Sequence, residues 1–161
     1  MNRTVFTILI TFCAFILEFV ISNLFGQSWV PNLCLVVMIL LTTTLGIRYG
    51  LISAVLGGIL KDSFTLNVFG VNTFSLVLSA YLSTFIARNL YHYDSKVSRT
   101  LLVFIVSLVN LTLQLFVTMI FRSIDIGQNI RFIFLPEIFM TSVAVLIFIN
   151  PLRRCVSKFC A

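Results

Sequence analysis

The chain has 161 residues, of which 60% are hydrophobic and 10% are charged, and its mean hydropathy is +1.12. A soluble domain carries about a quarter charged residues, so this composition predicts an all-α integral membrane protein and leaves no room for a soluble catalytic domain. The net charge is +6, but the sequence has no run of five or more basic residues, which argues against nucleic acid as a partner.

The first apolar run covers residues 5–25 and contains Glu18. A membrane-spanning helix needs about 20 apolar residues, so we expect an uncleaved first span here rather than a signal peptide. An acidic residue inside a span is a functional candidate by default. Glu18 is the one acid that this sequence places deep in a span.

Two short apolar runs follow, at residues 31–46 and 49–61, with only a Gly46–Gly50 turn between them. One continuous helix over residues 31–61 would be about 46 Å long, against a hydrocarbon core of about 30 Å. We therefore predict two short helices, and a single merged helix is the alternative. Further spans are predicted at 70–88, 100–121 and 132–150, which makes six in one membrane domain over residues 1–161.

Basic residues set the expected orientation. With six spans and both termini cytoplasmic, eight of the eleven basic residues lie on the cytoplasmic side: Arg3, Arg48, Arg88, Lys96, Arg99, Arg153, Arg154 and Lys158. Cytoplasmic loops of membrane proteins carry an excess of Lys and Arg. A merged second and third helix would reverse this bias, so the charges favour six spans with cytoplasmic termini.

A stripe of small residues leads to an acid in the third predicted helix. Gly50, Ala54, Gly58 and Asp62 follow one another at four-residue spacing, so they share one helix face. In a bilayer, small residues let two helix backbones approach closely. We therefore interpret the stripe as a helix-packing face, with Asp62 directed toward protein, water or the membrane interface.

Polar seams occur on the other predicted helices at the same spacing. The fourth span carries Asn72, Ser75, Ser79 and Ser83, and the fifth carries Ser107, Asn110, Gln114 and Thr118. Such side chains stabilise contacts between membrane helices. The alternative is that they line a polar cavity for a substrate or an ion, and we favour helix contacts.

Catalysis and metal binding are not expected. The single histidine, His92, lies in a predicted loop, and the four cysteines form no C-x-x-C pair. No nucleophile–base pairing is evident. The three acids in or near spans, Glu18, Asp62 and Glu137, are too scattered to define an ion pathway. We expect no cofactor.

Short motifs along the chain carry a family resemblance. Pro31-Asn32 opens the second span, Gly58 and Asp62 close the third, and Gly70-Val71 opens the fourth, which also contains Tyr81. Pro136-Glu137 opens the last span. In order and spacing, these residues resemble the rod shape-determining MreD family over essentially the whole chain. The chain departs from the family pattern at Ala54, Lys61 and Phe69.

The resemblance implies a non-enzymatic scaffold in the bacterial inner membrane. Members of this family assemble with MreC and link MreB filaments to the RodA glycosyltransferase and its partner transpeptidase. A homodimer is a further option. The residues that the family motifs mark for helix packing or partner contact are Pro31, Gly50, Ala54, Gly58, Asp62, Gly70, Tyr81, Pro136 and Glu137.

The family resembles in fold the substrate-binding S components of energy-coupling-factor vitamin transporters, so we expect an S-component-like bundle. A transporter subunit is therefore the alternative function. The short, nearly uncharged outer loops favour a scaffold. So does the first span, which has Ala14-x-x-x-Glu18 where S components tend to have Ala-x-x-x-Ala.

Overall fold

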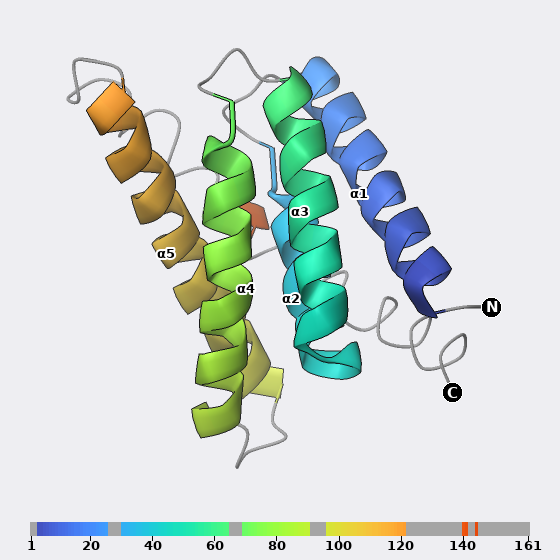
Figure 1. Cartoon of the computed structure of the whole chain (residues 1–161), viewed down its shortest axis with the longest axis vertical. Coiled ribbons are helices and arrows are strands. Elements are labelled where there is room, and N and C mark those ends of the chain that lie inside the picture. The colour runs from blue at the N-terminus through green and yellow to red at the C-terminus, as the bar shows by residue number, and fades with distance from the viewer. Residues whose placement is uncertain are drawn as a thin grey trace.

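The computed structural model describes five α-helices, with no strand among the described residues, which are 3–25, 30–64, 69–90, 96–121, 140, 141 and 144. The helices are α1 (Arg3–Phe25), α2 (Leu33–Leu45), α3 (Ile47–Phe64), α4 (Val71–Leu90) and α5 (Lys96–Phe121). They form a bundle in which α3, α4 and α5 lie side by side and α1 flanks α3 (Figure 1). The expected all-α class is confirmed.

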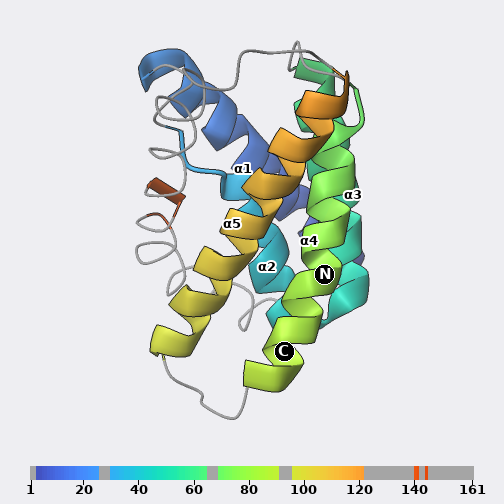
Figure 2. The ribbon, with the colours of Figure 1, turned by 90° about the vertical axis from the view of Figure 1, so that its left-hand side faces the viewer.

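The short helix α2 is the centre of the bundle. It contacts each of the other four helices, and in Figure 2 it is enclosed between α1, α5 and α4. Every residue from Leu33 to Thr42 is buried. A helix that is apolar on all sides is typically surrounded by protein or lipid, and here the protein surrounds it. At 13 residues it is about 20 Å long, shorter than the hydrocarbon core.

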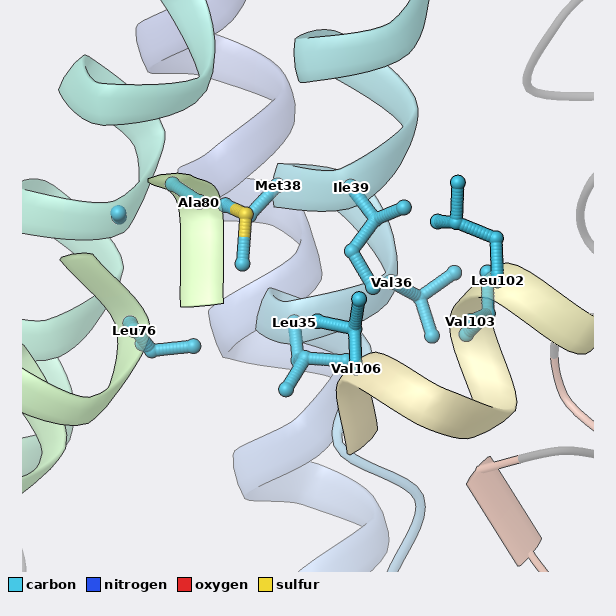
Figure 3. Close-up of a cluster of buried hydrophobic side chains, with 10 residues drawn as sticks. Leu35, Val36, Met38, Ile39, Leu76, Ala80, Leu102, Val103 and Val106 are labelled. Carbon is cyan, nitrogen blue, oxygen red and sulfur yellow. The ribbon is translucent and has the colours of Figure 1, made fainter. Parts of the chain in front are cut away.

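The apolar core lies where α2 meets α4 and α5. Leu35 and Met38 of α2 pack with Leu76 of α4 and Val106 of α5, and all four are nearly inaccessible (Figure 3). Ala54 of α3 belongs to the same cluster. Because these residues come from four helices, the core fixes the helices relative to one another.

A single non-helical residue, Gly46, separates α2 from α3. Gly46 has φ +101° and ψ 168°, and the amides of Tyr49 and Gly50 donate to its carbonyl oxygen at 3.2 and 3.3 Å. The merged helix is therefore wrong. The predicted turn over residues 46–50 is too long, because Ile47 to Gly50 already form the first turn of α3.

The outer face of α1 is apolar. Its large exposed side chains are Val5, Ile8, Leu9, Phe12, Ile16, Leu17, Phe19, Val20 and Leu24, whereas Thr7, Thr11 and Ala14 are buried inside the bundle. By length and hydropathy, Arg3–Leu24 is the one described helix that could cross a membrane unaided, and Leu33–Leu45 and Leu101–Val117 are shorter apolar helices.

Most of the predicted sixth span, 132–150, lies outside the described residues. Thr141 and Ala144 are described and helical. The Thr141 hydroxyl accepts a hydrogen bond from the backbone amide of Asn32 at 3.0 Å, and Ala144 packs with Ala14 and Leu41. This segment therefore meets α1 and α2. The number of spans, the S-component-like fold and the orientation of the termini stay predictions.

Candidate helix-packing site

Asp62 joins the end of α3 to the start of α4. Its Oδ1 accepts hydrogen bonds from the backbone amide and the side-chain amide of Asn72, each at 3.0 Å. Its Oδ2 accepts from the backbone amide of Thr73 at 3.0 Å and from the Thr73 hydroxyl at 2.6 Å. The carboxylate is buried.

Asn72 and Thr73 are the second and third residues of α4. The first four amides of a helix lack partners within the helix, and this end carries partial positive charge. A carboxylate that accepts from two of these amides is therefore a helix cap. This cap is unusual only because the capping side chain belongs to the preceding helix, α3. This accounts for a buried acid in an apolar chain without a ligand.

Gly58, one turn before Asp62, allows the two helices to approach. A Cβ at this position would collide with the Thr73 backbone and would lie 2.8 Å from its hydroxyl oxygen and 2.9 Å from its amide nitrogen. A backbone neighbour cannot rotate away, so a larger residue must push α4 from α3. The neighbouring Gly57 differs, because a Cβ there would meet Cys34 and Thr11 at an ordinary 3.5 Å.

The two other members of the stripe lie against α2 and in the apolar core. Gly50 lies against Thr42 across the α2–α3 turn, and a Cβ on Gly50 would collide with the Thr42 hydroxyl. Ala54 is completely buried in the core cluster with Leu35 and Ala80. The stripe thus lies against α2 at Gly50, enters the core shared by α2 and α4 at Ala54, and contacts α4 from Gly58 onward.

The remaining motif residues fall in different environments. Gly70 is the residue before α4. Its φ is +98°, a backbone conformation that residues with L side chains rarely adopt. Pro31 precedes Asn32, whose side chain accepts from the Leu35 amide at 3.1 Å and caps α2. Tyr81 is exposed on the outer side of α4. The predicted sites Pro136 and Glu137 lie outside the described residues.

A second polar cluster, which sequence reasoning missed, surrounds the N-terminus of α2. Lys61 Nζ lies 2.6 Å from Glu18 Oε1 and donates to Asn32 Oδ1 at 2.8 Å. Glu18 Oε2 accepts from the Cys34 amide at 3.1 Å. We call Glu18, Lys61, Asn32 and Cys34 the α2-start cluster. The available signal was the opposite charge of two unusual residues, Glu18 and Lys61.

The seams of α4 and α5 pair with each other. The Ser79 hydroxyl donates to Asn110 Oδ1 at 3.3 Å, and Gln114 Nε2 donates to Asn72 Oδ1 at 3.1 Å. Asn72 also donates to Asp62, so the hydrogen bonds continue from α3 through α4 to α5. Within the described residues, the buried Asn110 Nδ2 has no hydrogen-bond partner.

The described residues contain no group of three or more His, Cys, Asp or Glu side chains that could hold a metal ion. The buried Asp62 is instead used for a helix cap, and the largely buried Glu18 for an ion pair. What this arrangement accomplishes chemically is to hold helix ends together at close range.

Fold and site together define a small α-helical membrane protein whose buried polar groups connect its own helices. The family model of the rod shape-determining protein MreD matches residues 1–159 of the 161-residue chain. The chain therefore belongs to the MreD family, a membrane family with a role in determining rod shape, and the predicted resemblance is confirmed. No curated protein and no solved structure matches the chain.

Proposed function

We propose that this protein is a non-enzymatic, multi-pass scaffold of the bacterial inner membrane that assembles with MreC. In this role it couples MreB filaments to the RodA glycosyltransferase and its partner transpeptidase during cell elongation. The single membrane domain has six spans in an S-component-like bundle, with both termini in the cytoplasm. The observation that carries the proposal is the family match along nearly the whole chain.

The geometry supports a scaffold over a transporter subunit. The charges of Glu18 and Lys61 compensate each other, and Asp62 accepts hydrogen bonds from four donors of its own chain. A pocket that recognises a polar vitamin needs a few polar groups directed at the ligand. The charged groups buried between these helices are directed at helix ends instead.

The test uses two adjacent glycines as a matched pair. Gly58→Ala and the more disruptive Gly58→Leu place a side chain against the Thr73 backbone, whereas Gly57→Ala adds a methyl group at ordinary contact distance. Each variant is expressed in rod-shaped cells depleted of the native protein. We expect Gly57→Ala to restore rod shape and to co-purify with MreC at the wild-type yield.

We expect Gly58→Leu to lose most of the MreC and to leave the cells round, with Gly58→Ala intermediate. Wild-type MreC yield and full shape rescue by Gly58→Leu would reject the packing role. Failure of the wild-type chain to capture MreC would reject the scaffold function. A stoichiometric vitamin in the purified chain, measured by mass spectrometry, would favour the transporter alternative.

A further inference from the structure

The outer side of α4 carries a regular stripe of large side chains. Phe74, Leu78, Tyr81, Phe85 and Arg88 alternate four-residue and three-residue steps, so they share one helix face. We call these five residues the α4 outer stripe. Phe74, Tyr81 and Phe85 are 57%, 53% and 66% exposed. In Figure 1, α4 runs between α3 and α5, and the exposure of these three rings means that the described helices leave them largely uncovered.

Tyr81 distinguishes this stripe from a plain lipid-facing surface. It lies midway along the 20-residue α4, about 15 Å from either helix end. With α4 as one of the six proposed spans, Tyr81 therefore lies near the middle of a hydrocarbon core about 30 Å thick. Lipid tails offer no hydrogen-bond acceptor, and an unpaired hydroxyl in hydrocarbon is costly. The phenol is too short to reach either interface from this depth.

The other hydroxyl groups of α4 all have acceptors. Thr73 donates to Asp62, Ser79 donates to Asn110, and the hydroxyls of Ser75, Ser83 and Thr84 donate to carbonyls of their own helix. Within the part of the chain that the structure describes, the Tyr81 hydroxyl has no hydrogen-bond partner. Its acceptor therefore has to come from outside these residues.

Two candidates to cover the α4 outer stripe, the last segment of this chain and a second copy of it, are disfavoured. The described part of the last segment, at Thr141 and Ala144, packs against α1 and α2. A second copy would be inserted the same way up, so a two-fold dimer through this face would place Arg88 opposite Arg88. Like charges facing each other at an interface are unfavourable.

We propose that the α4 outer stripe is the docking surface for one transmembrane helix of a different protein. This helix is apolar, carries a hydrogen-bond acceptor opposite Tyr81 at mid-membrane depth, and carries no basic residue opposite Arg88. The stripe repeats every seven residues at Phe74, Tyr81 and Arg88, which is the spacing of left-handed helix pairs. The inference rests on the proposed function, which supplies MreC as the partner to be tested.

The first experiment substitutes a photo-crosslinking phenylalanine analogue at Phe85 in the full-length chain, in membranes that contain MreC. The matched control carries the same analogue at Phe12, which is similarly exposed on α1. We expect the Phe85 position to crosslink to the transmembrane segment of MreC, identified by peptide mass spectrometry. We expect the Phe12 position to give lipid adducts.

The second experiment removes one oxygen atom. Tyr81→Phe keeps the ring, and Tyr49→Phe makes the same change near the start of α3, where water can satisfy the hydroxyl. We expect Tyr81→Phe to lower the yield of co-purified MreC about three-fold, the effect of one hydrogen bond between membrane helices. Tyr49→Phe should leave the yield unchanged, and both variants should elute as the wild type does.

The outcomes separate this proposal from the proposed function. If the wild type captures MreC but Phe85 crosslinks only to lipid or to a second copy, the docking surface is wrong and the scaffold function stands. Unchanged MreC yield with Tyr81→Phe also contradicts the docking geometry. If the wild type captures no MreC, the scaffold function and this inference both fall.

Discussion

At the scale of single residues, Glu18 and Lys61 are the most unusual pair in the bundle. Each charge is costly when it is largely removed from water, and the two side chains compensate each other at 2.6 Å. Asn32 and the Cys34 amide satisfy further hydrogen bonds of the pair. The pair therefore holds α1, about two turns before its end, and the last turn of α3 on the start of α2.

We predict strong coupling between these two positions. Glu18→Gln or Lys61→Met leaves one largely buried charge without its counter-ion, so each single variant should lose roughly 3 kcal/mol of stability. The double variant should lose less than the sum, by about 1–3 kcal/mol. Thermal unfolding in detergent of the four proteins measures the coupling. Additive losses would show that the ion pair contributes no specific stability.

Asp62 gives a second residue-scale prediction. Asp62→Ala removes the cap of α4 and leaves its first amides without an acceptor, so we expect a loss of roughly 3 kcal/mol. Ser63→Ala is the control, because Ser63 is exposed and bonds only its own helix, and it should change stability by less than about 0.5 kcal/mol.

Thermal unfolding of the Asp62→Ala and Ser63→Ala proteins in detergent tests this account. A variant Asp62→Ala that unfolds like the wild type but loses MreC would contradict the cap and would make the carboxylate a partner contact. Loss of stability in the Asp62→Ala protein is the result that the cap requires.

The sequence predicts where Asp62 lies but not what it binds. Four-residue spacing places Gly58 and Asp62 on one face, and the apolar surroundings require that the acid face something polar. Its donors, Asn72 and Thr73, belong to the next helix. Which amides it reaches depends on how α3 and α4 cross, and spacing within one helix carries no such information.

At the scale of elements, Gly46 sets the reversal of chain direction between α2 and α3. Its φ of +101° and ψ of 168° fall in a region that is essentially restricted to glycine. A Cβ there would meet no atom within 4 Å, so the cost of a substitution is conformational rather than steric. One residue is enough for the reversal because Gly50 accommodates Thr42 on the opposite side of the break.

We predict that Gly46→Ala destabilises the protein by about 1–3 kcal/mol, through backbone strain alone. Gly46→Asn should give no relief, because the tolerance of Asn extends to the left-handed helical region and not to this one. Thermal unfolding of both variants in detergent, with Gly57→Ala as the tolerated glycine substitution, measures the effect. Wild-type stability of Gly46→Ala would show that the break does not depend on this conformation.

Helix positions were predictable to within a few residues, but helix surroundings were not. Breakers and apolar runs place the first span at 5–25, and the structure has α1 at Arg3–Phe25. The central burial of α2 was missed, because the runs that form α1 and α2 are both strongly apolar. Neighbours from four helices distinguish α2 from a lipid-facing helix, and they are a property of the tertiary packing.

At the scale of the whole molecule, the polar contacts gather toward one end of the bundle. Asp62 and Lys61 lie near the end of α3, and their partners lie at the starts of α4 and α2. Glu18 is seven residues before the end of α1, so the start of α2 lies about 10 Å below that end. The opposite end carries the α2–α3 break and Arg48.

The positive-inside rule orients this asymmetric bundle and yields a whole-molecule prediction. The end with the α3–α4 connection should face outward, and the α2–α3 break should face the cytoplasm. Single cysteines, Ser63→Cys and Arg48→Cys, are introduced where Cys13, Cys34, Cys155 and Cys160 have been replaced. A membrane-impermeant maleimide is then added to intact spheroplasts.

We expect Ser63→Cys to react in intact spheroplasts, because Ser63 is exposed near the outer end of α3. Arg48→Cys should react only after the membrane is permeabilised. The cysteine-free chain is the control for background labelling, and rescue of rod shape confirms that each variant is folded. Labelling of Arg48→Cys alone in intact spheroplasts would show that the bundle has the opposite orientation in the membrane. It would place the N-terminus of α1 outside, because α1, α2 and α3 cross in alternate directions.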